Sequence, residues 1–357
     1  MTDTVPRTNT TKLRFGSRTG GPSRRDALAE RVAVQQRERV IRADAIQRDR
    51  ARVASQYGRT GVAPFICNPD VQVIDLADGR AAAGFCKVRR WAVTAGDVVA
   101  PEAVTELALS QFIDTLRARR LRPAFVAVSD PDPYRRRGFD VSEIADEAVV
   151  DLATFSLQGS KRANLRHSVT SARRAGLTIA PYAHWQDEQI AAVSSEWLRT
   201  KRGGELGFTL SRMDDVAGQL GDRATDLWVA LDAGGDVQAW CTWRHYLGGR
   251  GRVLDVMRRR TNAPNPAMDY LIAGTLELYR DAGLERASLA SVPREHGAAA
   301  ERIYPTRSLR AYKQKFDPRW EPRWLAVPAV WQRPFALAAI SSAYCPGGMR
   351  RALVRNH

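Results

Sequence analysis

The sequence has few of the residues on which many common active sites depend. Only four of its 357 residues are cysteines and five are histidines. The cysteines form no C-x-x-C pair, and no two histidines stand at i, i+4 spacing, so neither a disulfide framework nor a metal site is predicted. The motifs H-E-x-x-H, G-x-S-x-G and G-x-x-x-x-G-K-[ST] are also absent. Zincin, α/β-hydrolase and P-loop chemistry therefore have no support in the sequence.

Long hydrophobic runs are missing as well. No run of about 18 apolar residues occurs, which argues against a transmembrane helix, and the apolar stretch Phe335 to Tyr344 is too short to span a bilayer. No apolar segment follows the basic residues near the N-terminus, so no secretory signal is predicted. We expect a cytoplasmic protein, with peripheral contact at the inner face of the membrane as an option. At 44% hydrophobic residues the chain still has enough apolar side chains for a sizeable core.

Positive charge is abundant and unevenly distributed. Lys and Arg number 55 against 39 Asp and Glu, a net charge of +16, and only six of the 55 are Lys. Residues 1–60 hold 14 basic and 6 acidic residues, a net of +8. We predict a basic arm over 1–60, flexible at first and helical from Asp26 to about Tyr57. Such an arm suits tRNA or an anionic membrane, and it equally suits a solvated helix with no partner.

The remaining sequence predicts a mixed α/β fold in which one order of elements occurs twice. Strands are expected at Val71–Leu76, Ala81–Val88, Trp91–Val93, Ala124–Val128 and Glu147–Leu152, with a helix at Pro101–Arg120. The second set has helices at Lys161–Ala175, Trp185–Arg199 and Ala267–Gly283, and strands at Leu227–Leu231, Gln238–Trp243, Gly251–Met257 and Arg286–Ala290. We therefore predict domains at 61–155 and 156–328, followed by a C-terminal tail or helix at 329–357.

The helix that begins near Lys161 is unusually cationic. It carries five basic side chains and no acidic one, namely Lys161, Arg162, Arg166, Arg173 and Arg174. Like charges at helical spacing repel one another, so the pattern favours a surface that binds phosphate groups over one that is merely solvated.

Two carboxylates stand in apolar surroundings. Asp255 lies inside a predicted apolar strand, and Asp269 lies at the start of an apolar helix. A buried carboxylate needs a partner or acquires a shifted pKa, which makes both residues candidates for acid/base chemistry. A purely structural salt bridge to Arg258, Arg286 or Lys313 is an equally good interpretation.

Four sequence blocks together resemble the C-terminal synthase domain of the bacterial aminoacyl-phosphatidylglycerol synthases of the multiple-peptide-resistance-factor type. The blocks are EAVVDLATFSLQGSKRANLRHS at 147–168, WLRTKRGGELGF at 197–208, VLDVMR with APNPAMDYLI at 253–272, and LRAYKQKFDPRWEPRWL at 309–325. The resemblance covers roughly residues 60–328. It implies two acetyltransferase-like (GNAT) folds in tandem and an enzyme that moves an aminoacyl group from aminoacyl-tRNA to an acceptor hydroxyl, without a cofactor.

The resemblance also implies roles for individual residues. Asp255, Lys313 and Glu205 become candidate catalytic residues, and Asp269, Arg258 and Lys315 become candidate substrate-binding residues. The cations Lys161, Arg162, Arg166 and Arg173 become candidates for binding tRNA or lipid phosphate. The acceptor is either phosphatidylglycerol or a small hydroxylamine, because soluble relatives in antibiotic biosynthesis, as in the valanimycin pathway, move a seryl group from seryl-tRNA to such a molecule.

Two other functions stay open at this point. An acyl-CoA-dependent N-acetyltransferase of the same fold would need an R/Q-x-x-G-x-G/A loop, and the nearest stretch, RRRGF at 135–139, lacks its last small residue. A non-catalytic RNA- or membrane-binding protein would use only the basic arm and the cationic helix. Such a protein would have no need for the carboxylate and lysine blocks.

Overall fold

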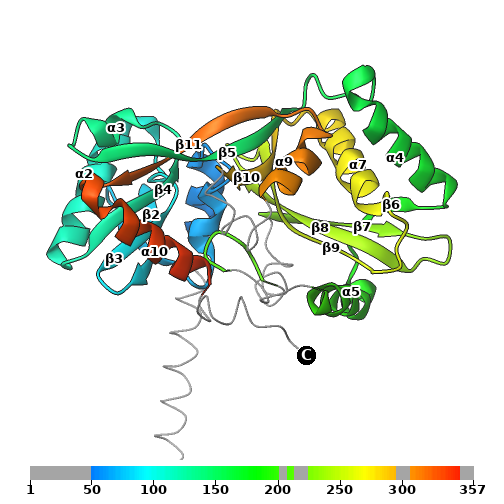
Figure 1. Ribbon diagram of the computed structural model, residues 1–357, viewed down its shortest axis with the longest axis horizontal. Helices are drawn as coiled ribbons and strands as arrows, with labels where there is room; N and C mark the ends of the chain where they lie inside the picture. Colours follow the sequence, from blue (N-terminus) through cyan, green and yellow to red (C-terminus); the bar gives the residue numbers. More distant parts are fainter. Residues whose placement is uncertain (1–49, 201–206, 213–223, 295–305, 346–357) are drawn as a thin grey trace, which may run out of the picture. The chain divides into compact units, whose positions relative to one another are not determined.

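A computed structural model of the chain describes residues 50–200, 207–212, 224–294 and 306–345 (Figure 1). They belong to a compact unit that begins at Asp49. Most of the predicted basic arm lies outside the described residues, as does Glu205, and within the arm residues 50–57 are helical. None of the described helices is both long enough and apolar enough to cross a bilayer.

Two successive sets of elements make up the described chain. The first set comprises η1 (Ala63–Cys67), β1 (Gln72–Leu76), β2 (Ala81–Val88), β3 (Trp91–Ala95), η2 (Glu102–Val104), α2 (Thr105–Ala118), β4 (Arg122–Val128), α3 (Asp132–Arg135) and β5 (Asp140–Asp151). The second comprises η3 (Ser160–Arg162), α4 (Ala163–Arg174), β6 (Thr178–Pro181), η4 (His184–Gln186), α5 (Asp187–Arg199), β7 (Thr225–Leu231), β8 (Val237–Tyr246), β9 (Gly251–Arg259), α7 (Ala267–Asp281), β10 (Arg286–Pro293), α9 (Thr306–Gln314) and β11 (Arg319–Val327). After them come η5 (Val330–Gln332) and α10 (Arg333–Tyr344).

The strands form one mixed sheet in the order β1-β2-β3-β4-β11-β5-β10-β9-β8-β7-β6. Each set contains one parallel pair, β3 with β4 and β9 with β10, and the other neighbours are antiparallel. The last strand of each set crosses to the other set, since β11 lies between β4 and β5 while β5 also pairs with β10. The predicted mixed α/β fold and its repeated order are therefore confirmed. The domain bounds stay a prediction, because the two sets share strands at the centre of the sheet.

Alternation along the strands explains how helices cover both faces. In β3, Trp91, Val93 and Ala95 pack with α10 and η1, whereas Ala92 faces the core that contains α2. In β8, Ala239, Cys241 and Trp243 join the core with α4 and α7, and Trp240 joins Ile190 and Val193 of α5. Successive side chains of a strand point to opposite faces, so strands buried on both faces are apolar nearly throughout.

The sequence prediction differs from the structure mainly near the sheet centre. Strand β5 begins seven residues before the predicted Glu147, and β11 was expected as a motif without an assigned element. A proline such as Pro322 argues against a central strand because it lacks an N–H. Here β11 pairs with β4 only from Trp324 onward, so Pro322 faces β5 alone within the printed ladder.

Candidate functional site

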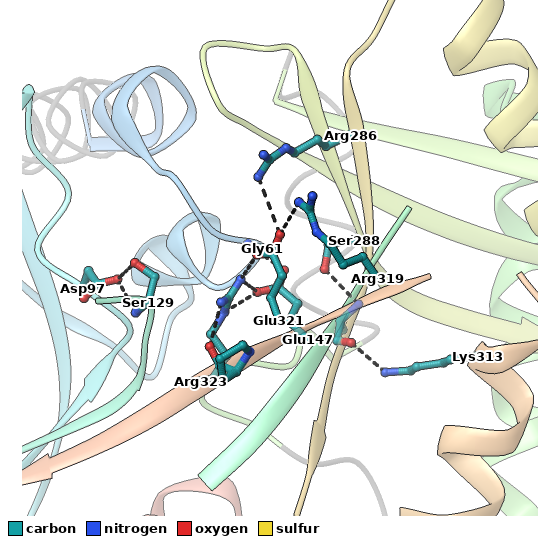
Figure 2. A network of polar contacts seen from close by, with 12 residues as sticks. Gly61, Asp97, Ser129, Glu147, Arg286, Ser288, Lys313, Arg319, Glu321 and Arg323 are labelled. Atoms are coloured by element: carbon teal, nitrogen blue, oxygen red, sulfur yellow. Dashed lines mark hydrogen bonds and ion pairs between the residues drawn. The ribbon is translucent and has the colours of Figure 1, made fainter. Parts of the chain in front are cut away.

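A buried ion pair occupies the middle of the sheet. Glu147 on β5 and Arg323 on β11 have side chains that are 1% and 4% exposed. The Arg323 guanidinium donates from Nε to Glu147 Oε2 at 2.7 Å and from Nη2 to Glu321 Oε2 at 2.9 Å. Burial alone would lower the pKa of Arg323, but Glu147 and Glu321 raise it above its ordinary value. Arg323 therefore stays charged and balances two carboxylates at the centre of the fold (Figure 2).

The segment before η1 reaches this ion pair through its backbone. The Gly61 N–H donates to Glu147 Oε1 at 3.0 Å. A Cβ at position 61 would lie 2.5 Å from that oxygen and 2.8 Å from Ser288 Oγ. The close approach therefore requires glycine, and it leaves Glu147 with partners on both carboxylate oxygens.

Lys313 lies close to this network, on α9, and it is also buried. Its side-chain nitrogen Nζ donates to the carbonyl oxygens of Ala290 at 2.9 Å and Ser291 at 3.2 Å. Burial lowers the pKa of Lys313 to about 7, although the charge of Glu147 opposes the shift. An amine with this pKa is substantially neutral near neutral pH, so it can accept a proton from a substrate.

A strand irregularity turns these carbonyl groups toward Lys313. The register between β10 and β5 shifts between Ser288 and Ser291, and Ala290 there has φ of +64°. A positive φ is strained for a residue with a Cβ, and such strain often accompanies functional sites. Past Ser288, β10 also leaves β9, since the two strands pair only over Arg286–Ser288 and Gly251–Val253. The second parallel pair thus opens beside the buried lysine.

Two of the predicted site residues form a structural contact. Asp269, in the first turn of α7, accepts a hydrogen bond from Lys315 Nζ at 2.9 Å and another from Ser168 Oγ of α4 at 3.0 Å. The predicted alternative of a salt bridge is therefore what Asp269 forms, but its partner is Lys315 rather than Arg258, Arg286 or Lys313. The contact ties α7 to α4 and to the end of α9.

Two further predicted residues lie on β9 and contact the α5 side of the second set. Asp255 Oδ1 accepts the backbone N–H of Ser211 at 3.1 Å. The Arg258 guanidinium stacks over the ring of Trp197 at 3.8 Å and donates to the Met257 carbonyl at 3.0 Å. Stacking of this kind holds a guanidinium in place while leaving its donor edge available for an anion.

The cationic helix is used partly for structure. Arg162 Nη1 donates to the Ser156 carbonyl at 2.7 Å, and Arg166 Nη1 donates to the Leu157 carbonyl at 2.8 Å, so both secure the loop that precedes α4. Lys161 and Arg173 are exposed, and Arg173 lies over Tyr270 at 6.0 Å. The surface available to phosphate groups is therefore smaller than the sequence predicts.

Glu147 and Arg323 were not among the predicted site residues. Both lie within the sequence blocks that carry the family resemblance. The available signal was a charged residue inside an otherwise apolar strand, which needs a buried partner. Their pairing could not be predicted because 176 residues separate them in the chain.

The first parallel pair is closed by a buried carboxylate. Asp97, just after β3, accepts hydrogen bonds from Ser129 N–H at 2.9 Å and Ser129 Oγ at 2.7 Å, just after β4, and from Tyr134 Oη at 3.1 Å. Burial raises the pKa of Asp97, although these hydrogen bonds oppose the shift. A cavity of about 110 Å³ lies here, lined by residues that include Thr60, Asp97 and Ser129, and it does not include Lys313. We place the candidate chemistry at Lys313, because Asp97 already has hydrogen-bond partners on both oxygens.

No metal centre is found in the part of the chain that the structure describes. No group of three or more His, Cys, Asp or Glu side chains there is placed to hold a metal ion.

Comparison with known proteins gives consistent matches. The family model described as phosphatidylglycerol lysyltransferase, C-terminal, matches residues 50–327. The phosphatidylglycerol lysyltransferase of Bacillus subtilis is 27% identical over 273 residues, which is 70% of this chain and 31% of that protein. The lysylphosphatidylglycerol biosynthesis bifunctional protein LysX of Mycobacterium ulcerans is 28% identical over 290 residues, covering 73% of this chain and 26% of LysX. The chain thus spans about a third or less of the length of these relatives.

Solved structures match the fold over nearly their whole length. The C-terminal domain of a putative lysylphosphatidylglycerol synthetase from Agrobacterium fabrum superimposes with a TM-score of 0.74 and 26% identity, covering 85% of this chain and 98% of that one. The structure of L-PGS from Bacillus licheniformis gives a TM-score of 0.72 and 23% identity over 81% of this chain and 94% of the other. FemX, at 10% identity and a TM-score of 0.53, shares the fold alone.

Proposed function

Because this chain belongs to the family described as phosphatidylglycerol lysyltransferase, C-terminal, we propose that it transfers an aminoacyl group from aminoacyl-tRNA to a hydroxyl group of phosphatidylglycerol. The printed names of the relatives support a transferase that acts on this lipid. The observation in the structure that supports it best is the buried Lys313, with a pKa of about 7, beside an opened pair of parallel strands.

The proposed reaction needs little beyond positioning and proton transfer. The ester that joins an amino acid to tRNA is already activated, so the acceptor oxygen attacks its carbonyl carbon and forms a tetrahedral intermediate. The new C–O bond forms, the bond to the ribose oxygen breaks, and the acceptor proton ends on that ribose oxygen. The protein must therefore supply a base that returns its proton, donors for the oxyanion, and a partner for the substrate ammonium.

Lys313 is our candidate for the base. Its two hydrogen bonds to backbone carbonyl groups hold Nζ in place, and its lowered pKa lets it take the hydroxyl proton and return it to the leaving ribose. Glu147 and Arg323 act as positioning residues, because they fix β5 and β11 next to the strand irregularity that presents those carbonyl groups.

The other predicted residues receive roles in the same proposal. Asp255 and Glu205 are candidates to bind the substrate ammonium, and Arg258, held over Trp197, is a candidate donor to the oxyanion or to a phosphate. Asp269 and Lys315 shape the site by joining α7 to α9. Lys161 and Arg173, which are exposed on η3 and α4, are candidates for tRNA phosphate, with Arg162 and Arg166 holding the adjoining loop.

A single labelling experiment tests the proposal. The chain is incubated with aminoacyl-tRNAs, each carrying one labelled amino acid, and with detergent micelles of phosphatidylglycerol. Label in the lipid extract supports the proposed function, and the amino acid that gives it identifies the donor. Label in a water-soluble product when a small hydroxylamine is offered would contradict the lipid acceptor. Label that stays on tRNA, or is only hydrolysed, would contradict the transferase.

A further inference from the structure

Helix α10 is apolar on both of its faces. Its inner face, formed by Ala336, Ala339, Ile340 and Ala343, is buried against the core beneath β2 and β3. A helix that is apolar all round is normally covered on every side, either by protein or by lipid. The outer face of α10 has no such cover.

The uncovered side chains are large and lie close together in sequence. Val330 and Trp331 of η5 are 62% and 61% exposed, and Phe335 and Leu337 of α10 are 59% and 39% exposed. Pro334 and Ala338 are exposed between them. The four large side chains and their neighbours, defined here as the α10 outer face, carry no charged group apart from Arg333 at their edge.

Contacts at both ends hold this face in a fixed position. Arg333 Nη2 donates to Asp140 Oδ1 at 2.6 Å, which joins the start of α10 to β5. At the other end the Tyr344 carbonyl accepts the Gly207 N–H at 3.0 Å, and the Tyr344 hydroxyl lies 2.6 Å from Thr209 Oγ1. The apolar side chains therefore project from a secured helix rather than from a loose tail.

Size and charge indicate what covers the α10 outer face. At these exposures the four large side chains present on the order of 400 Å², given roughly 150–250 Å² for a whole aromatic side chain. A stable dimer buries about 800 Å² per partner, so this face alone is too small to hold a second copy. Residues 328–357 contain four arginines and no acidic residue, which complements an anionic surface. Trp and Phe beside basic residues suit the boundary between lipid headgroups and acyl chains.

We propose that the α10 outer face docks onto the surface of an anionic lipid bilayer. The inference rests on the proposed function, since an enzyme that modifies phosphatidylglycerol must reach it in a membrane. The helix lies in the interface with Trp331 and Phe335 at the headgroup boundary, and it does not cross the bilayer. Docking would hold the chain against its acceptor between turnovers.

The test measures binding of the full chain to vesicles. Vesicles of equal parts phosphatidylglycerol and phosphatidylcholine are sedimented with the wild type and with the Trp331→Ser/Phe335→Ser variant. We expect the variant to bind at least about tenfold more weakly, and both to bind phosphatidylcholine vesicles poorly. The matched control is Trp185→Ser/Leu107→Ser, which removes two side chains that are 63% and 49% exposed elsewhere, and it should bind within about twofold of the wild type.

Three outcomes would overturn the inference. One is equal vesicle binding by the two double variants. Another is no binding of the wild type to the mixed vesicles. A third is a wild-type dimer in sedimentation equilibrium that the Trp331→Ser/Phe335→Ser variant abolishes, since the face would then join two copies of the chain.

Transfer in micelles separates this inference from the proposed function. Detergent micelles offer phosphatidylglycerol without a bilayer, so the Trp331→Ser/Phe335→Ser variant should keep its micellar activity and lose activity on vesicles. Vesicle binding without any transfer would refute the proposed function and leave the docking surface standing. Micellar transfer by a wild type that does not bind vesicles would do the reverse.

Discussion

The two parallel strand pairs of the sheet are built alike and finished differently. Strands β3 and β4 pair over five residues, Trp91–Ala95 with Arg122–Val126, and Asp97 then joins their ends through Ser129. Strands β9 and β10 pair over only three residues before a register shift carries β10 along β5. The first pair is closed by a carboxylate with hydrogen bonds on both oxygens, whereas the second opens beside a buried lysine.

The difference shows how one architecture can provide a scaffold in one set of elements and chemistry in the other. Hydrogen bonds to Asp97 are complete within the protein, so that group adds stability and offers little to a substrate. Lys313 is held by carbonyl groups only, which leaves it able to exchange a proton. Substitutions at the two pairs should therefore have opposite effects on activity and on stability.

The largest effect is expected from Lys313→Met. This variant removes the proposed base while keeping a long apolar side chain, so transfer should fall by roughly 10²–10⁴-fold. The measurement is the rate of label transfer to phosphatidylglycerol in micelles, with a melting curve to show that the fold persists. Lys87→Met, at an exposed lysine of β2, is the control and should stay within about twofold of the wild type. A Lys313→Met rate that matches this control would remove Lys313 from the mechanism.

Next in size is the loss of stability in Arg323→Met. Without the guanidinium, Glu147 is a buried charge without its counter-ion, and we expect the free energy of unfolding to fall by about 3–5 kcal/mol. Arg319→Met, on the same strand but 61% exposed, should cost no more than about 1 kcal/mol. Urea unfolding measures both. Similar losses in the two variants would mean that the central ion pair is no more important than a surface one.

Asp97→Asn should have a smaller effect that falls on stability alone. The amide places donors where the carboxylate accepted from Ser129 and Tyr134, so we expect a loss of about 1–3 kcal/mol in the free energy of unfolding. Transfer per folded molecule should stay within about twofold. A large drop in transfer from a variant that remains folded would show that the closed pair takes part in the reaction.

The smallest effect is a pH dependence of stability due to Lys313. Its pKa is about 7 in the folded chain, against an ordinary value of 10.5. Between these values the unfolded chain binds a proton that the folded chain lacks, so the free energy of unfolding rises with pH, by at most about 1.4 kcal/mol per unit. Below about pH 7 both forms are protonated, and the full cost of burying the ammonium is present.

The measurement for this prediction is a comparison of variants by denaturant unfolding. From about pH 6 to about pH 9 the wild type should gain stability relative to Lys313→Met, whereas its difference from Lys87→Met should stay flat. A wild type that loses stability relative to Lys313→Met as pH rises would have the wrong sign and would refute the lowered pKa.

Much of the fold could be predicted because its strands are apolar on both faces. The bounds predicted for β2 agree with the structure, and most other strands differ by a few residues. The errors lie where a local pattern conflicts with long-range pairing. The charged, proline-containing segment of β11 does not resemble a central strand, and only its pairing with β5 and β4 makes it one.

The candidate site was predictable in kind rather than in its connections. Lys313 and Asp269 stand out as charged residues among apolar neighbours, and both are buried. The partner of Asp269 is Lys315, which no spacing rule singles out, since α7 and α9 are distant in sequence. The central pair of Glu147 and Arg323 escaped prediction for the same reason.

The exchange of the last strands also has a consequence for how the chain folds as it is synthesised. When β4 and β5 leave the ribosome, β11, which will separate them, has yet to be made. Until then both strands expose edges that invite pairing with other chains. Contacts between residues so far apart are slow to form, because closing a long loop costs entropy before any contact repays it. The middle of the sheet, where the proposed chemistry lies, is therefore the last part of the molecule to be completed.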